Sequence, residues 1–327
     1  MVYENEKFGS SRFQDFYEIK ELYRSQAGAV YSARFKFDKN KYVLKERTFP
    51  ELGKRKDIMN EVNLLAQLDH PNVVKCEGFF RDPSRNSLFI ILEYCKNGDL
   101  KEIVDSYRTK GKYLEEGFIW HIFCQLCDGL KHMHANGIVH RDLKPMNIMV
   151  VTKNCKKTGE PIKFTVKLAD LGVSRQLSEE TMMLQTVYGT PLYLSPELVE
   201  NKQYNEKTDI WSLGVILYEL AALKHPFRSN TLLGLARAVV KGTYEDVPSQ
   251  YSRQLRKCLS WMLNLDFSKR PNVTQLHKFV EDRTFMFRAM AVDYSILLFS
   301  YSISSGALES PDLLLSYSVI LLALHNT

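Results

Sequence analysis

Two features that would place this chain in other protein classes are missing from its sequence. No apolar run reaches the roughly 18 to 20 residues that a membrane-spanning helix needs, because Ile296–Phe299 and Leu313–Leu324 are both shorter. The 44 Lys and Arg residues are scattered through the first 288 positions and give a net charge of only +6. A scattered charge of this size does not indicate a nucleic-acid-binding surface, so we expect no nucleic-acid partner.

Cysteine is also sparse. The chain has six cysteines among 327 residues and no secretory signal at Met1–Glu4, which predicts a reducing compartment and a cytoplasmic location. Cys124 and Cys127 form a single C-x-x-C in an apolar helical stretch, with no second pair to complete a zinc site. We interpret them as buried core thiols. His132 and His134 are two residues apart, so they face different directions and make a poor metal pair.

Positive charge is absent from the end of the chain. Residues 289–327 contain no Lys or Arg and only three acidic residues. Three interpretations of the apolar tail, residues 285–327, are open. It is a helical hairpin that packs on the domain or on a partner, a weak membrane association, or an alternative or mis-spliced end that merely follows the domain. We favour the last interpretation and do not expect membrane contact through the tail.

The first part of the chain shows the alternating pattern of β-strands. It is rich in Val, Tyr and Phe from residue 17 onward, and Asp38–Asn40 supplies a hairpin turn. Strands are predicted at Tyr17–Leu22, Ala29–Phe37, Lys41–Glu46 and within Asn86–Tyr94. One helix is predicted over Asp57–Leu68, because Ile58, Val62 and Leu65 fall on one stripe and Pro71 prevents continuation.

The second part of the chain is mostly helical. Helices are predicted at Asp99–Tyr107, Glu115–Asn136, Thr208–Leu223, Asn230–Lys241 and Ser252–Asn264, with short strands at residues 150–151 and 164–168. This arrangement predicts an α+β fold with a small β-rich N-lobe and a larger helical C-lobe. The predicted boundaries are a leader at 1–16, an N-lobe at 17–93, a hinge at 93–98, a C-lobe at 99–284 and the tail at 285–327.

Three motifs in a fixed order indicate the chemistry. His140–Asn147 reads HRDLKPMN, Asp170–Gly172 reads DLG, and Ser195–Glu197 reads SPE. Each motif alone is a weak signal, but an eight-residue match after a helix, with D-x-G downstream of a strand, is a strong one. Together the motifs predict a protein kinase that moves the γ-phosphoryl group of ATP onto a protein hydroxyl.

The residue types in these motifs match what phosphoryl transfer requires. Asp142 is the candidate catalytic base, and Lys144 lies two residues on, where it can neutralise the migrating phosphoryl group. Asn147 and Asp170 supply hard oxygen ligands for Mg²⁺. Lys45 is the candidate for the α- and β-phosphates of ATP. Its predicted ion-pair partner is Glu61 on the helix that follows.

The loop expected to cover the nucleotide departs from the usual glycine pattern. The segment Leu22–Val30 keeps only the third glycine of G-x-G-x-x-G-x-V, Gly28, and has Tyr23 and Ser25 in place of the first two. Glycine at these positions lets the backbone turn tightly and approach phosphate. We therefore expect a lower ATP affinity or a slower closure.

These residues resemble the eukaryotic protein kinase family over Tyr17–Val280. The segments 92–100, 189–197 and 204–214 are similar to those of the NIMA-related (Nek) serine/threonine kinases. The resemblance implies that Leu92 is the gatekeeper and that Glu93 and Cys95 offer backbone hydrogen bonds to adenine. It implies further that Asp99 lies near the ribose. The residues that would sandwich the adenine ring are Leu22, Val30, Val43 and Met149.

The same resemblance implies several positioning and regulatory roles. Asp209 would anchor the catalytic loop, and Glu197 would pair with Arg270. An apolar spine would stack Leu65, His140 and Leu171. Thr186 occupies the position at which Nek-like kinases are phosphorylated, where the added charge would pair with Arg141 and order the loop. An activating kinase or a regulatory protein is thus an expected partner beside the protein substrates. Centrosomal, cytoskeletal or nuclear association is implied by family analogy.

Two rival functions are retained. A pseudokinase would keep the fold as a binding or scaffolding module, and the altered glycine loop is its only support. A small-molecule kinase is a weaker rival, because Gly189-Thr190-Pro191 and Ser195–Glu197 shape a peptide-binding surface in the family.

Overall fold

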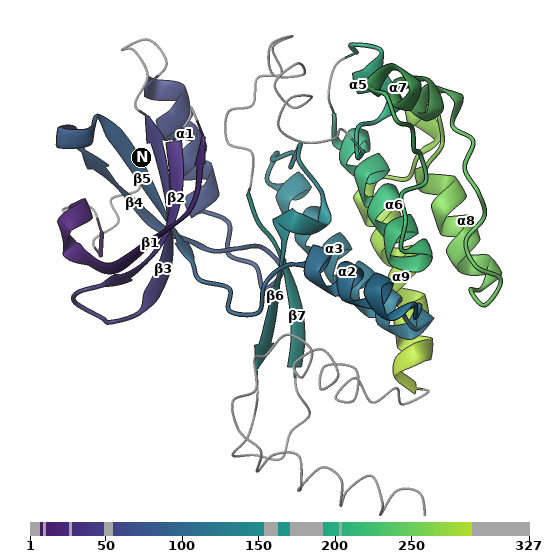
Figure 1. The fold of residues 1–327 in the computed structure, drawn as a ribbon, viewed down its shortest axis with the longest axis horizontal. Helices are drawn as coiled ribbons and strands as arrows, with labels where there is room; N and C mark the ends of the chain where they lie inside the picture. Colours follow the sequence, from purple (N-terminus) through teal and green to yellow (C-terminus); the bar gives the residue numbers. More distant parts are fainter. Residues whose placement is uncertain are drawn as a thin grey trace, which may run out of the picture.

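The computed structural model describes residues 7–8, 11–25, 28–48, 55–153, 163–170, 192–202 and 205–289. Within these ranges the chain forms a β-rich N-lobe and a mostly helical C-lobe (Figure 1). The two lobes are joined by the residues that follow Glu93, the last residue of β5. The predicted α+β bilobal fold is confirmed.

The N-lobe is an antiparallel five-stranded sheet with one long helix. The strands are β1 Phe16–Ser25, β2 Gly28–Phe35, β3 Lys41–Thr48, β4 Cys76–Asp82 and β5 Ser87–Glu93, in the order β1-β2-β3-β5-β4, and the helix is α1 Arg55–Ala66. Burial alternates along β3, where Tyr42, Leu44 and Glu46 are buried and the residues between them are partly exposed. One face of the sheet therefore packs on an apolar core within the N-lobe, and the opposite face carries Lys45 and its neighbours.

Part of the predicted leader packs against this sheet. Phe8 is completely buried, with its ring 4.9 Å from that of Phe35 and 5.5 Å from that of Tyr42. Phe13 also lies over the sheet, 5.1 Å from the ring of Phe89. Residues 7–8 and 11–16 are thus part of the N-lobe rather than a loose leader, because their aromatic rings cover apolar sheet surface.

The C-lobe is built around two buried helices and a β-hairpin. Its elements are α2 Leu100–Lys110, α3 Glu116–Ala135, β6 Ile148–Lys153, β7 Lys163–Leu168, α5 Pro196–Val199, α6 Glu206–Ala222, α7 Leu232–Lys241, α8 Arg253–Met262 and α9 Val273–Ala289. From Thr208 onward every residue of α6 is buried, and most of them are apolar, as expected for a helix in the interior of a lobe. The hairpin β6–β7 packs on α3 and places the segment before β6 at the end of that helix (Figure 1).

Three of these elements were not predicted, and one predicted boundary falls inside a helix. β4, α5 and α9 are absent from the sequence prediction, and α9 continues to Ala289, past the predicted domain end at 284. Residues 290–327, including most of the predicted tail, lie outside the described residues. None of the helices formed by the described residues is long and apolar enough to cross a membrane.

Candidate active site

The segment His140–Asn147 connects α3 to β6 and is held by one carboxylate. Asp209, buried near the start of α6, accepts hydrogen bonds from the backbone N–H of His140 at 2.8 Å and of Arg141 at 3.0 Å. Its Oδ2 also lies 2.8 Å from Nε2 of His134. Arg141 has a φ of 70°, a left-handed conformation that is costly for a residue with a Cβ. Asp209 therefore stabilises a strained loop, which fits the anchoring role that the resemblance implies.

Three of the predicted site residues meet directly in this loop. Lys144 Nζ lies 2.9 Å from Oδ2 of Asp142. Asn147 donates from Nδ2 to the backbone carbonyl of Asp142 at 2.8 Å and to its Oδ2 at 3.1 Å. These contacts occupy the amide nitrogen of Asn147 as a donor, so the amide oxygen is the atom suited to a hard cation.

Asp170 and Lys45 connect the two lobes. Asp170 follows β7 and forms an ion pair with Lys45 on β3. The preceding residue, Ala169, donates its N–H to the carbonyl of Asn147 at 2.8 Å, which places Asp170 beside the catalytic loop. Burial opposes ionisation of Asp170, but the charge of Lys45 outweighs it and lowers the pKa of the carboxyl to about 2. Asp170 is therefore an anion at neutral pH.

The predictions for Glu61 and for the apolar spine are only partly covered. Glu61 lies on α1, but its side chain is outside the described residues, so its pairing with Lys45 stays a prediction. Leu65 is buried, and His140 is completely buried. Burial lowers the pKa of His140 and outweighs the opposite effect of Asp209, Asp142 and Asp170, so its ring is neutral. Leu171 lies outside the described residues.

Two of the residues expected around adenine, Val30 and Val43, share one face of the sheet. In the β2–β3 register Val30 is opposite Lys45, and in the β3–β5 register Val43 is opposite Leu92. Val43 and Lys45 are two residues apart on β3, so they point to the same face. Lys45 on this face reaches Asp170, and Val30 and Val43 therefore face the C-lobe.

The linker between the lobes is fixed by polar contacts that no motif marks. The Glu93 carboxylate accepts the backbone N–H of Lys75 at 2.7 Å and pairs with Lys167 Nζ of β7 at 2.6 Å. Cys95 is buried, and burial and the nearby charge of Glu93 raise the pKa of its thiol to about 12. A thiol in this state is unreactive, so the contribution expected of Cys95 is its backbone.

Asp99 and Met149 lie side by side where the linker meets the C-lobe. The two residues form an isolated antiparallel bridge. Asp99 caps α2, because its Oδ1 accepts the backbone N–H of Glu102 at 3.0 Å. Burial raises the pKa of the Asp99 carboxyl. Asp99 thus has a structural role in this state besides the ribose contact that the resemblance implies.

The β1–β2 hairpin explains why the third glycine is kept. Gly28 has a φ of 144°, and a Cβ at this position would lie 2.0 Å from the backbone oxygen of Glu46. Only glycine fits this close approach. The side chains of Leu22 and Tyr23 are exposed. Residues 26–27, at the tip of the hairpin, are outside the described residues.

A buried ion pair fixes the base of the C-lobe. Arg270 donates to both carboxylate oxygens of Glu197, at 2.7 and 2.8 Å, and both residues are buried. The pairing predicted from the resemblance is therefore present, and Thr208 Oγ1 adds a third donor at 3.0 Å. The proposed switch Thr186 lies within residues 171–191, outside the described residues.

Comparison with known proteins agrees with this geometry. The chain matches the protein kinase domain family over residues 16–280. It is 40% identical over 263 residues to a probable serine/threonine-protein kinase, nek3, of Dictyostelium discoideum, which covers 79% of this chain and 22% of the relative. It is 39% identical over 265 residues to serine/threonine-protein kinase Nek5 of Mus musculus, and the match covers 81% of this chain and 40% of that relative.

A human relative gives the same result. Serine/threonine-protein kinase Nek2 of Homo sapiens is 34% identical over 273 residues, which cover 81% of this chain and 59% of the relative. The chain therefore spans between about a fifth and three fifths of the lengths of these relatives. The protein belongs to the protein kinase family, and its kinase domain is of the Nek-like type.

Proposed function

We propose that this domain transfers the γ-phosphoryl group of ATP to serine and threonine hydroxyls of protein substrates. The observation that carries the proposal is the meeting of three separate elements at one place. The ion pair between Lys45 and Asp170 joins β3 to the end of β7, and the hydrogen bond from Ala169 to Asn147 joins that end to the catalytic loop.

The loop residues have the positions that the transfer needs. Asp142 would orient the acceptor hydroxyl and take its proton as the new O–P bond forms and the bond to the leaving diphosphate breaks. Lys144, 2.9 Å from Asp142, would face the transferred group. Because the chemistry demands little covalent work from the protein, most of the rate would come from this positioning.

The donor set fits Mg²⁺. The amide oxygen of Asn147 and the carboxylate of Asp170 are hard oxygen ligands, and the low pKa of Asp170, about 2, leaves it ionised without a metal. Bound Mg²⁺ would neutralise the charge of the β- and γ-phosphates. Lys45 would contact the α- and β-phosphates, and the face that carries Val30 and Val43 would receive the adenine.

The substrate and regulatory proposals rest on the family. Lys144 after HRDL and Thr190 in the Gly-Thr-Pro segment are features of serine/threonine kinases, and the relatives carry that name. Phosphorylation of Thr186 by an activating kinase, with Arg141 as the partner of the phosphate, remains our proposal for regulation. The cytoplasmic location stays a prediction.

The test is γ-phosphate transfer to a generic serine/threonine protein substrate by the full chain with Mg²⁺. Transfer that is lost in Asp170→Ala supports the proposal, and it shows that Tyr23 and Ser25 are tolerated in the glycine loop. A folded protein that binds ATP but transfers nothing, even with a phosphorylated Thr186, would establish the pseudokinase instead. A small-metabolite panel run beside the protein substrate distinguishes the small-molecule kinase.

A further inference from the structure

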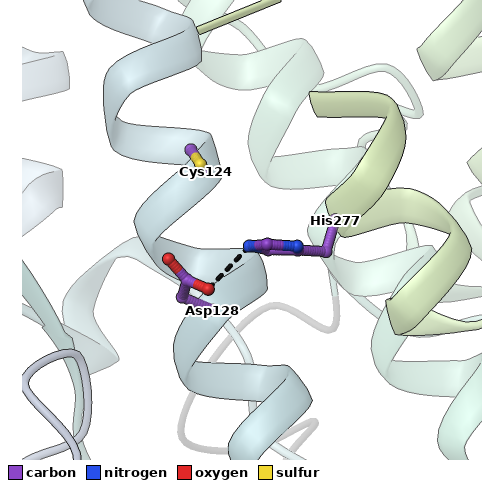
Figure 2. A group of neighbouring side chains, drawn as sticks. All are labelled: Cys124, Asp128 and His277. Atoms are coloured by element: carbon purple, nitrogen blue, oxygen red, sulfur yellow. Dashed lines mark ion pairs between the residues drawn. The ribbon is translucent and has the colours of Figure 1, made fainter. Parts of the chain in front are cut away.

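A second group of reactive side chains lies where α9 packs against α3, outside the proposed active site. Cys124 and Asp128 are one turn apart on α3, and His277 approaches them from α9 (Figure 2). One ligand atom from each residue lies within 4.8 Å of the other two. The shortest of these contacts, 2.6 Å, joins His277 Nε2 to Asp128 Oδ1.

The three donor types form a set that Zn²⁺ accepts. Thiolate sulfur, imidazole nitrogen and carboxylate oxygen all bind this ion, at about 2.3, 2.0 and 2.1 Å. In a tetrahedral site these lengths put the ligand atoms about 3.4 to 3.6 Å apart. The contact between His277 and Asp128 would have to open by less than 1 Å, and Cys124, now within 4.8 Å of both, would have to approach by at most about 1.2 Å. Side-chain rotation supplies movements of this size.

The other nitrogen of His277 has the surroundings of a metal-bound imidazole. Its Nδ1 lies 3.7 Å from a carboxylate oxygen of Glu281, one turn further along α9. Histidine ligands regularly donate this second N–H to a carboxylate, which orients the ring and directs the lone pair of Nε2 toward the metal. Two pairs of residues at i and i+4 spacing, one on each of two packed helices, thus provide three metal ligands and a carboxylate, Glu281, beside the histidine ligand.

The thiol is the feature that a plain ion pair does not explain. Asp128 and His277 would join the helices without Cys124. Cys127, the other member of the C-x-x-C, is completely buried, whereas Cys124 is only partly buried. Cys127 is thus a core thiol as predicted, whereas Cys124 packs against the core and stays partly exposed.

We propose that Cys124, Asp128 and His277 form a Zn²⁺ site that joins α3 to α9. Binding would displace the thiol proton of Cys124, and the ring proton of His277 would move from Nε2, beside Asp128, to Nδ1, which faces Glu281. The two anionic ligands, Cys124 and Asp128, would balance the charge of the ion. A water molecule would complete the coordination from the solvent side, where 42% of the Asp128 side chain is exposed. The site would fix α9 to the centre of the C-lobe.

The experiment titrates Co²⁺, as a spectroscopic substitute for Zn²⁺, into the metal-free full-length protein. Cobalt bound to a thiolate gives a charge-transfer band in the near ultraviolet, and cobalt bound to the oxygen ligands of Asn147 and Asp170 does not. We expect the band to reach its full intensity at one equivalent of Co²⁺ per protein, and to disappear when one equivalent of Zn²⁺ is added. Absence of the band from the folded wild-type protein would overturn the proposal.

Variants test the assignment. Cys124→Ser should abolish the band, and Asp128→Asn and His277→Gln should each weaken Co²⁺ binding at least tenfold. Glu281→Gln should weaken it about tenfold through the orientation of His277. Cys155→Ser is the matched control, because it removes a thiol that is not one of the three proposed ligands. A band that survives Cys124→Ser, or that disappears in Cys155→Ser, would contradict the assignment.

Discussion

Loss of Arg270 should destabilise the C-lobe more than loss of an exposed cation. The guanidinium makes two hydrogen bonds to Glu197, and it also donates to the backbone oxygen of Asn264 at 2.8 Å and of Lys207 at 3.1 Å. The Arg270 side chain is 0% exposed and that of Glu197 is 4% exposed. In Arg270→Ala the carboxylate of Glu197 stays buried without its charge partner.

The expected magnitude follows from this burial. Removal of one partner of a buried ion pair costs about 3–5 kcal/mol, because the other charge is left uncompensated. For a domain of this size, 1 kcal/mol corresponds to about 2–4 °C in Tm, so the fall in Tm should be on the order of 10 °C. Arg270→Lys should recover only part of this, because an ammonium group cannot donate to both carboxylate oxygens in the planar geometry of arginine.

Urea unfolding and thermal melts of the full chain measure these effects. Lys101→Ala is the control, since Lys101 pairs with Asp105 on α2 with both side chains more than 40% exposed, and it should cost less than about 1 kcal/mol. The double variant Glu197→Leu, Arg270→Met should be more stable than Arg270→Ala, because no buried charge is left alone. Arg270→Ala within 1 kcal/mol of wild type, on the scale of the control, would refute the reasoning.

Three further predictions concern the active site. Gly28→Ala should destabilise the N-lobe by about 2 kcal/mol or more in urea unfolding. Gly111→Ala is the control, at a φ of 63° with open space around it, and it should cost only about 1 kcal/mol. Equal costs for the two variants would contradict the steric explanation. Asp209→Asn should lower kcat on the order of 100-fold with little change in the KM for ATP. An amide has one acceptor oxygen for the two backbone N–H groups of His140 and Arg141. A change in KM alone, measured by steady-state kinetics, would refute this prediction. Asp170 has a folded-state pKa of about 2, below its ordinary value of 3.8, so its stabilising contribution is complete above pH 4 and is lost as the pH falls toward 2. The difference in unfolding free energy between wild type and Asp170→Asn should therefore shrink on acidification, and growth of that difference would disprove the sign.

The catalytic segment could be predicted from the sequence because its residues act over short distances along the chain. Asp142, Lys144 and Asn147 lie within six residues, so the motif itself fixes most of their geometry. Lys45 and Asp170 are 125 positions apart. The motifs assigned both to the nucleotide site, but the partner predicted for Lys45 was Glu61, and its ion pair with Asp170 was not predicted. The contacts of Glu93 with Lys75 and Lys167 could not be predicted, because no local sequence pattern marks them.

Two of the missed elements, β4 and α9, show a different limit. β4, Cys76–Asp82, contains Gly78 and ends in charged residues, so its local strand signal is weak, and pairing with β5 determines its structure. α9 does carry a start signal that could have been used. Asn272 accepts the backbone N–H of Gln275 at 2.8 Å, directly after Pro271. His277 and Lys278 interrupt its apolar positions, and for this reason the helical period is hard to see.

The ion pair between Lys45 and Asp170 makes nucleotide and metal binding thermodynamically linked. When Lys45 contacts the phosphates of ATP, it no longer neutralises Asp170. ATP bound without a metal would therefore place the charged phosphates beside the ionised carboxylate of Asp170. A divalent cation removes this repulsion, so each ligand should tighten the binding of the other by the same factor. Calorimetric titration of ATP with and without Mg²⁺ measures that factor, and Asp170→Asn should reduce it toward one.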